Sequence, residues 1–187
     1  MGSQAGHALG GNRSGVPVKV HVLTAVTRPW NLPLIAGSLA NAAAAAGCDI
    51  CWHWQFDSER RHVGGQAVKN RMLDEITDGW VWLLDDDTLV HPNLLRRART
   101  VSGDQAVDAI VFSQARADGR QLTAAPANVR VGDIDAGQAI LRRDLIGATR
   151  LHESYEGDGI FLADVLGRAN AVYVDEFLSL HNALAFR

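Results

Sequence analysis

Three consecutive carboxylates, Asp85-Asp86-Asp87, form the segment of this sequence best suited to bind a charged ligand. They follow five apolar residues, 80–84, whose Trp, Val and Leu side chains predict a buried strand. Open α/β sheets bind ligands where their strands end, and a bound Mg²⁺ or Mn²⁺ would balance the repulsion between adjacent carboxylates. In an extended backbone Asp85 and Asp87 project to one side and Asp86 to the other. For the acids alone, a solvated turn is the alternative interpretation.

A second acidic segment, Glu156-Gly157-Asp158, precedes an amphipathic helix expected over residues 160–168. The helix dipole favours acids at this end, so capping alone would explain Asp158. Backbone N–H groups there would lower the pKa of Asp158, whereas Glu156 and an acceptor that excludes water would raise it. The acids around Gly157 and Gly159 exceed what a cap requires, and the glycines allow close approach of a ligand and movement of the segment.

The composition is that of one globular domain, with 187 residues, a net charge of −3 and 47% hydrophobic residues. Such a chain can bury a sizeable core, and its charge indicates no nucleic-acid-binding surface. No apolar run is long enough to form a transmembrane segment. Residues 1–16 are rich in Gly, Ser and Asn and have no hydrophobic signal region, so we interpret them as a disordered leader or tag. Residues 17–187 are then a single domain.

Cys48 and Cys51 form a C-x-x-C motif at the start of an expected strand. Redox motifs of this kind stand at the opening of a helix, so we interpret these cysteines as reduced, structural thiols. Reduced thiols fit a cytoplasmic location, either free or peripheral to the inner face of the membrane.

Strand and helix patterns alternate along the first 112 residues. Strands are expected over residues 18–24, 49–56, 80–84 and 106–112, and helices over 32–46, 66–77 and 92–101. Asn31 is expected to cap the first helix, which stops at Gly47. This alternation predicts an α/β fold with a mostly parallel, doubly wound, Rossmann-like sheet and helices on both faces. The second half is less regular, with strands expected near 137–141, 171–174 and 176–180 before His181.

This order of pieces resembles the small inverting glycosyltransferases of the GT-A fold, which are nucleotide-sugar enzymes of the family-2 type. The resemblance covers nearly all of residues 18–181. Thr24-Ala25-Val26-Thr27-Arg28-Pro29 is similar to the family's segment along the nucleotide, and Asp57 stands where the family keeps an acid for the base edge. Lys69-Asn70 is similar to the family's Arg-Asn pair that faces the diphosphate.

The remaining motifs follow in the family's order. Asp85-Asp86-Asp87 contains the D-x-D signature, and Asp135-Ala136-Gly137 is similar to the small-residue turn before the acceptor strand. Glu156-Gly157-Asp158 stands in the place of the family's Glu-Asp pair. Thr27 replaces a frequent aromatic residue, Met72 replaces a frequent glycine, and Gly157 interrupts the acid pair.

The resemblance implies a single-domain GT-A glycosyltransferase that uses Mn²⁺ or Mg²⁺. The donor is expected to be a nucleotide sugar, UDP- or GDP-linked, and the acceptor a glycan or small molecule. The implied catalytic residues are Asp158 and Glu156. The implied nucleotide- and substrate-binding residues are Thr24, Val26, Thr27, Arg28, Asp57, Lys69, Asp85, Asp86 and Asp135. The implied metal ligands are Asp87 and Asp85, with His181 in the place of a C-terminal histidine that completes the metal shell in some relatives.

The chemistry of the residue types agrees with this assignment. A departing nucleoside diphosphate concentrates negative charge, which a divalent metal neutralises as a Lewis acid and which Lys69 or Arg71 would further offset. The attacking hydroxyl must lose a proton, for which Asp158, with Glu156 nearby, is the candidate base. One base and direct displacement give inversion, and the sequence shows no nucleophile for a double displacement.

Two alternatives belong to other functional classes. A nucleotidyltransferase uses a similar sheet and acidic site, but usually opens with a Gly-rich loop, which the segment 25–29 lacks. A catalytically silent nucleotide- or sugar-binding module is the other, because the chain offers little acceptor-binding material.

The residues Trp52, Trp54, Trp80 and Trp82 alternate along two expected strands, where packing is favoured over sugar stacking.

Overall fold

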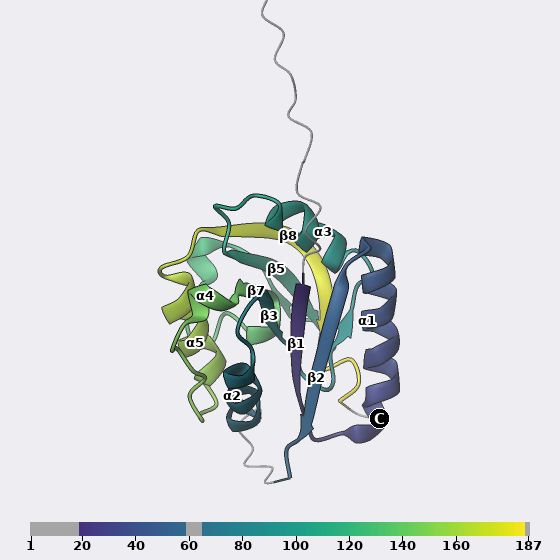
Figure 1. The fold of residues 1–187 in the computed structure, drawn as a ribbon. Helices are drawn as coiled ribbons and strands as arrows, with labels where there is room; N and C mark the ends of the chain where they lie inside the picture. The colour runs from purple at the N-terminus through teal and green to yellow at the C-terminus, as the bar shows by residue number, and fades with distance from the viewer. Residues whose placement is uncertain (1–18, 59–64, 186–187) are drawn as a thin grey trace, which may run out of the picture.

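The computed structural model describes residues 19–58 and 65–185, which fold around one curved sheet (Figure 1). The proposed leader, residues 1–16, and residues 59–64 lie outside the described residues. The strands are, in spatial order, β2 (Asp49–Phe56), β1 (Lys19–Val26), β3 (Trp80–Leu83), β7 (Ala139–Arg142), β5 (Ala109–Arg116), β8 (Ala171–His181) and β4 (Leu89–Val90), with β6 (Gln121–Leu122) on β5.

The longest strand pairings are parallel. β1 pairs in parallel with β2 and β3, and β5 pairs in parallel with β8. β7 lies between β3 and β5 and is antiparallel to both. The predicted mostly parallel, Rossmann-like sheet is therefore confirmed. β1, β2, β3, β5 and β8 all end at the same edge of the sheet, which is also the edge where β7 begins.

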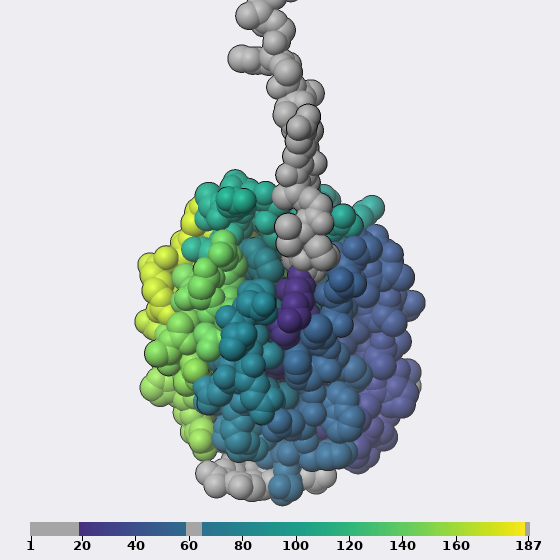
Figure 2. Space-filling model, in the orientation of Figure 1, coloured from purple at the N-terminus to yellow at the C-terminus, as the bar shows by residue number. Residues whose placement is uncertain are grey.

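Helices cover both faces of the sheet. α1 (Leu32–Ala46) and α3 (Leu94–Ser102) pack on one face, where Ile35 and Leu39 meet Val20 and Val22. α2 (Gln66–Glu75), α4 (Arg143–Ile146) and α5 (Gly157–Leu166) lie on the opposite side. The space-filling view shows α2 between β2 and the green segment that contains α4 and α5 (Figure 2). Within the described ranges, no helix is long and apolar enough to cross a bilayer.

The buried tryptophans behave as expected for packing residues. Trp82 is fully buried, stacks edge-to-face on Phe112, and donates from its indole nitrogen to the Gly137 carbonyl at 2.9 Å. Trp80 is also buried, whereas Trp54 on the edge strand β2 is 44% exposed. Cys48 and Cys51 are both free thiols.

Three local expectations need correction. Asn31 precedes α1 but makes no side-chain cap, because its amide donates to the Asp86 and Leu184 carbonyls instead. The second acidic segment is already helical, since α5 begins at Gly157 rather than near residue 160. β8 is one continuous strand from Ala171 to His181, bent by a register shift, rather than two shorter segments. The predicted stop of α1 is confirmed, as Gly47 adopts a left-handed φ of 57°.

Candidate active site

Five segments bring ionisable side chains to the edge where β1, β3 and β8 end. The turn after β3 supplies the three consecutive aspartates, and α2 supplies Lys69. Asp135 precedes the short 3-10 helix Ala136–Gln138 at the start of β7, Asp158 lies in the first turn of α5, and His181 ends β8. Because these segments are far apart in sequence, the antiparallel insertion of β7 and the parallel pairing of β8 are what assemble the cluster.

Lys69 and Asp85 form the central ion pair. Lys69 is only 1% exposed, and its Nζ lies 2.6 Å from Asp85 Oδ1. Burial alone would lower the pKa of Lys69, but the charges of Asp85, Asp158 and Asp135 raise it above its usual range. Burial alone would likewise raise the pKa of Asp85, but Lys69, His181 and Arg28 hold it below its usual range. Both partners are therefore charged at neutral pH.

Asp85, Asp135 and His181 form a group that can hold a metal ion. One ligand atom from each lies within 4.8 Å of the others. The His181 Nδ1 atom lies 3.7 Å from Asp85 Oδ2 and 3.2 Å from the Thr88 hydroxyl. Burial and the charge of Asp85 raise the pKa of Asp135, a crowding of carboxylates that a bound cation would relieve. Two carboxylates and one imidazole suit a divalent ion such as Mn²⁺.

Asp86 faces away from this group and holds the loop after β1. Its Oδ2 accepts from the backbone N–H groups of Thr27 and Arg28, both at 2.6 Å, and from the Thr27 hydroxyl at 3.0 Å. Its Oδ1 accepts from Arg28 Nη1 at 2.7 Å. These four hydrogen bonds occupy both carboxylate oxygens, so Asp86 joins the end of β3 to the Thr27–Arg28 backbone.

Asp87 lies beside the metal-binding group but outside it. Its Oδ2 is 3.2 Å from Arg28 Nη1, and its Oδ1 is 3.9 Å from His181 Nδ1. Asp85 and Asp87 thus both approach His181, although the backbone is a turn, closed by the Thr88 N–H and the Asp85 carbonyl at 3.2 Å. Of the three predicted metal ligands, the structure brings Asp85 and His181 together and puts Asp135 in the third place.

Asp158, rather than Glu156, faces the cluster. Burial, together with the charges of Asp85 and Asp135, raises the pKa of Asp158 to about 6, although Lys69 and the Ala136 backbone oppose the shift. Burial therefore outweighs the backbone N–H groups that were expected to lower this pKa, even without an acceptor. Oδ1 of Asp158 is buried and has no hydrogen-bond partner among the described residues. Glu156 is exposed and its side chain caps nothing.

The two glycines of this segment provide close packing. A Cβ at Gly157 would lie 2.0 Å from the His152 carbonyl oxygen, and one at Gly159 would lie 2.8 Å from Val131 Cα. The start of α5 is thus wedged between two loops, which fixes the Asp158 backbone.

The five remaining predicted nucleotide-binding residues, which lie on β1 or just after β1 and β2, fall into two sets. Thr24 and Val26 are buried in β1, where the Thr24 hydroxyl accepts from the Trp52 indole at 3.0 Å and the Val26 carbonyl accepts from the Asp57 N–H at 2.9 Å. Thr27, Arg28 and Asp57 lie at the edge itself, where a Cβ at Gly65, the residue before α2, would lie 3.7 Å from an Asp57 oxygen.

Searches by sequence match no protein-family model and no curated protein. Solved structures do match. S. aureus TarS 1–349 superimposes with a TM-score of 0.64 at 14% identity, over 87% of this chain and 60% of that one. TarS 1–349 in complex with UDP-GlcNAc gives 0.63 at 13% identity, over 87% of this chain and 57% of that one.

A glycosyltransferase involved in the glycosylation of the major capsid of PBCV-1 matches with a TM-score of 0.52 at 11% identity, over 87% of this chain and 91% of that one. The fold is that of a GT-A-type glycosyltransferase. The resemblance stated from the sequence is confirmed at this level, and this chain spans 60% of the length of TarS 1–349. The acidic cluster lies at the carboxyl edge of this GT-A sheet.

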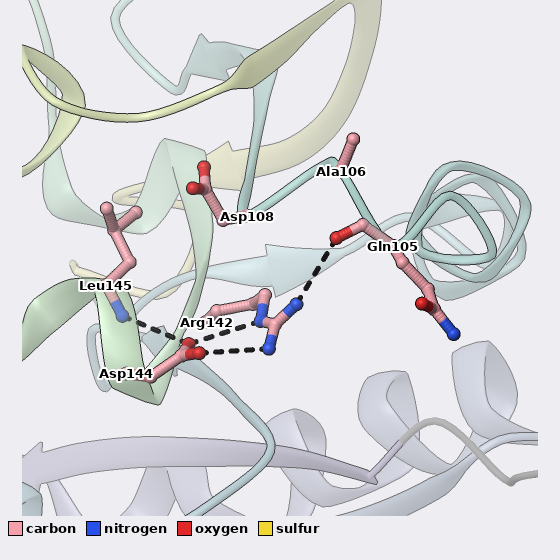
Figure 3. Close-up of a pocket in the computed structure, with 6 residues that line it drawn as sticks. All are labelled: Gln105, Ala106, Asp108, Arg142, Asp144 and Leu145. Atoms are coloured by element: carbon pink, nitrogen blue, oxygen red, sulfur yellow. Dashed lines mark hydrogen bonds and ion pairs between the residues drawn. The ribbon is translucent and has the colours of Figure 1, made fainter.

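A pocket on the opposite edge of the GT-A sheet contains none of the cluster residues. It is lined by Gln105, Ala106, Asp108, Arg142, Asp144 and Leu145 (Figure 3). Arg142 donates to both Asp144 oxygens, at 3.1 and 2.9 Å, so the one cation that lines this pocket is already paired, whereas Oδ1 of Asp108 has no hydrogen-bond partner among the described residues. The acidic cluster therefore remains the candidate active site.

Sequence reasoning missed Asp135 as a partner of His181. The segment 135–137 was expected to form a turn of small residues. The Asp135 carboxylate could not be assigned to the metal-binding group without knowing where β7 lies in the sheet. It also missed Asn182, whose amide contacts Asp87.

Asp158 is expected to destabilise the metal-free protein at neutral pH. Its pKa is about 6 in the folded chain against an ordinary 3.8, so between pH 4 and pH 6 the unfolded chain ionises first and the free energy of unfolding falls. Asp158→Asn should therefore stabilise the protein by roughly 1–3 kcal/mol at pH 7.5 and by little at pH 4. Urea unfolding in EDTA measures this, with the exposed Glu156→Gln as the control. An equal gain at both pH values would contradict the assignment.

Proposed function

We propose that this chain is a metal-dependent glycosyltransferase that moves a sugar from a nucleotide-sugar donor to an acceptor hydroxyl with inversion. The observation that carries the proposal is the Asp158 carboxylate, with a buried, unpartnered Oδ1 and a pKa of about 6, beside the Lys69–Asp85 pair and the metal-binding group. The complexes of TarS 1–349 with UDP-GlcNAc and with UDP support a UDP-sugar as the donor.

Donor binding is proposed at the carboxyl edge of β1 and β3. Asp85, Asp135 and His181 would hold Mn²⁺ or Mg²⁺, which would neutralise the diphosphate as it leaves. Arg28, whose side chain is 34% exposed, adds positive charge to the same edge while tied to Asp86 and Asp87. Lys69 acts through Asp85, which it keeps ionised. Asp57 is proposed to accept a hydrogen bond from a base N–H.

Asp158 is proposed as the general base. The acceptor oxygen forms a bond to the anomeric carbon while the bond from that carbon to the diphosphate oxygen breaks, and the hydroxyl proton passes to Asp158. A base is most effective when its pKa lies near the working pH, and burial has moved Asp158 in that direction. One displacement inverts the anomeric centre.

The loop after β1 disfavours the nucleotidyltransferase alternative. Such enzymes need free backbone N–H groups there to hold phosphates, whereas the N–H groups of Thr27 and Arg28 both donate to Asp86. The silent binding module is distinguished by assay, because it would bind a donor without cleaving or transferring the sugar.

The proposal is tested by a thermal-shift panel of UDP-, GDP-, CDP- and TDP-sugars with and without MnCl₂, followed by donor hydrolysis. A ligand that binds only the native state raises its stability, by about 2.7 kcal/mol at a hundredfold excess over Kd. We expect a metal-dependent shift with UDP-sugars and slow hydrolysis. Asp57→Asn in the same panel should weaken the preference among bases. Binding without hydrolysis or transfer would support the silent module, and no shift at all would contradict the proposal.

Two variants test whether Asp135 or Asp87 is the third metal ligand. Calorimetry of UDP binding should show that Asp135→Asn loses about tenfold or more of the affinity gained from MnCl₂, because it removes a charged ligand from the group. An asparagine there can still accept from the Gly137 N–H, so the turn is retained. Asp87→Asn should keep most of the metal response. The opposite result would make Asp87 the third ligand, as the sequence alone indicated.

Two variants test whether Asp158 or Glu156 is the general base. Asp158→Asn should bind donor and metal normally but lower kcat for transfer by about 10²–10⁴-fold, the usual contribution of a general base. Glu156→Gln, an exposed neighbour with the same change of charge, should transfer at nearly the wild-type rate. Should only Glu156→Gln lose transfer, Glu156 is the base. Normal transfer by both variants would rule out the single-base mechanism.

A further inference from the structure

Asn182 has an unusual backbone conformation next to the metal-binding group. It directly follows His181 and has a φ of +59°, the only positive φ among the described non-glycine residues. Left-handed backbone costs an L-residue roughly 1–2 kcal/mol, and asparagine tolerates it better than most. Such a conformation persists where surrounding contacts hold it in place.

The Asn182 side chain lies between the Asp87 carboxylate and the Arg116 guanidinium. With its nitrogen toward Asp87, the amide donates to Asp87 Oδ2 at 3.0 Å and accepts from Arg116 Nη2 at 3.1 Å. Only this orientation gives both contacts a donor and an acceptor. Arg116 ends β5 and is the register partner of His181 on β8, so its backbone is fixed by the sheet.

These contacts are part of a continuous series of polar contacts that includes Asp87, in the turn after β3. Arg28 contacts Asp87 on the other side, at 3.2 Å from Oδ2, which gives the order Arg28, Asp87, Asn182, Arg116. The backbone follows the same path, because the Leu184 N–H donates to the Asp87 carbonyl at 3.1 Å. The turn that carries Asp85 and the turn that follows His181 are therefore fastened together on both sides of Asn182.

From this arrangement we infer that Asn182 is a positioning residue for the metal-binding group. Its amide binds Asp87, which would otherwise be free to approach His181 Nδ1, now 3.9 Å from Asp87 Oδ1. Its left-handed backbone turns the chain immediately after His181, so that Nδ1 remains near Asp85 and Asp135. The inference rests on the proposed function in one respect, that a divalent cation binds to this group together with a nucleotide.

The test compares UDP affinity with and without MnCl₂, a ratio that a purely structural role would not change. Asn182→Gly keeps the backbone conformation and removes the amide, and should lower the affinity gained from MnCl₂ by about tenfold, as for other residues that orient metal ligands. UDP affinity in EDTA should stay within about twofold. Asn182→Ala adds backbone strain and should lose at least as much of the metal gain. Asn128→Gly, which removes an amide bonded to the carbonyl and hydroxyl of Thr123, is the matched control.

Arg116→Met supplies a second route, since it removes the other partner of the amide and leaves Asp87 and His181 in place. It should reduce the metal gain in the same direction but less. Suppose that both Asn182→Gly and Arg116→Met keep the wild-type increase in UDP affinity caused by MnCl₂ within twofold. That result would overturn the inference and leave the proposed function intact. If wild-type UDP affinity does not respond to MnCl₂, the metal role in the proposed function fails, and the inference fails with it.

Discussion

The ion pair between the buried Lys69 and the partly buried Asp85 is the interaction on which the rest of the site depends. Burying an ammonium group is costly unless it is paired, and the 2.6 Å contact with Asp85 supplies that pairing. The same ammonium also offsets the charges of Asp135 and Asp158, which are partly buried in the same cluster. Three carboxylates against one lysine still leave an excess of negative charge. That excess explains the attraction of a divalent cation, and it adds to burial, the larger cause, in raising the pKa of Asp158.

The sheet topology explains how such a cluster forms in a small chain. All the parallel strands end at one edge, and β7 enters from that edge in the opposite direction, so Asp135 at its start meets Asp85 at the end of β3. β8 runs parallel to β5 and delivers His181 to the same place. The cluster therefore needs no long loops, because each residue lies at the first or last turn of a regular element. This gives the side chains a rigid support.

Much of the fold followed from local sequence patterns. The apolar run before the three aspartates predicted the buried strand β3, and the alternation of strands and helices predicted the parallel sheet and its two covered faces. Those patterns depend on periodic burial, which a short window of sequence records. Local patterns failed where a distant partner decided the outcome. Asn31 has the position of a cap, yet its amide bonds to the carbonyls of Asp86 and Leu184.

The same limit applies within the site. The sequence placed three aspartates at the end of a strand but could not assign a separate partner to each, because the backbone there forms a turn rather than an extended strand. Lys69 forms an ion pair with Asp85, and the backbone of the loop after β1 donates hydrogen bonds to Asp86. Asp87 contacts Arg28 and the Asn182 amide. The pairing of Asp135 with His181 likewise needed the position of β7. Asp158 was assigned from sequence, but only its burial shows why its pKa is raised.

The proposed activity requires a divalent metal and a nucleotide diphosphate to bind together at the carboxyl edge of this sheet. The most direct measurement is anomalous diffraction from crystals grown with MnCl₂ and UDP. Our account predicts one manganese peak bound by Asp85, Asp135 and His181, with UDP extending toward Arg28 and Asp57. A manganese peak elsewhere, or UDP bound at this edge without manganese, would contradict it.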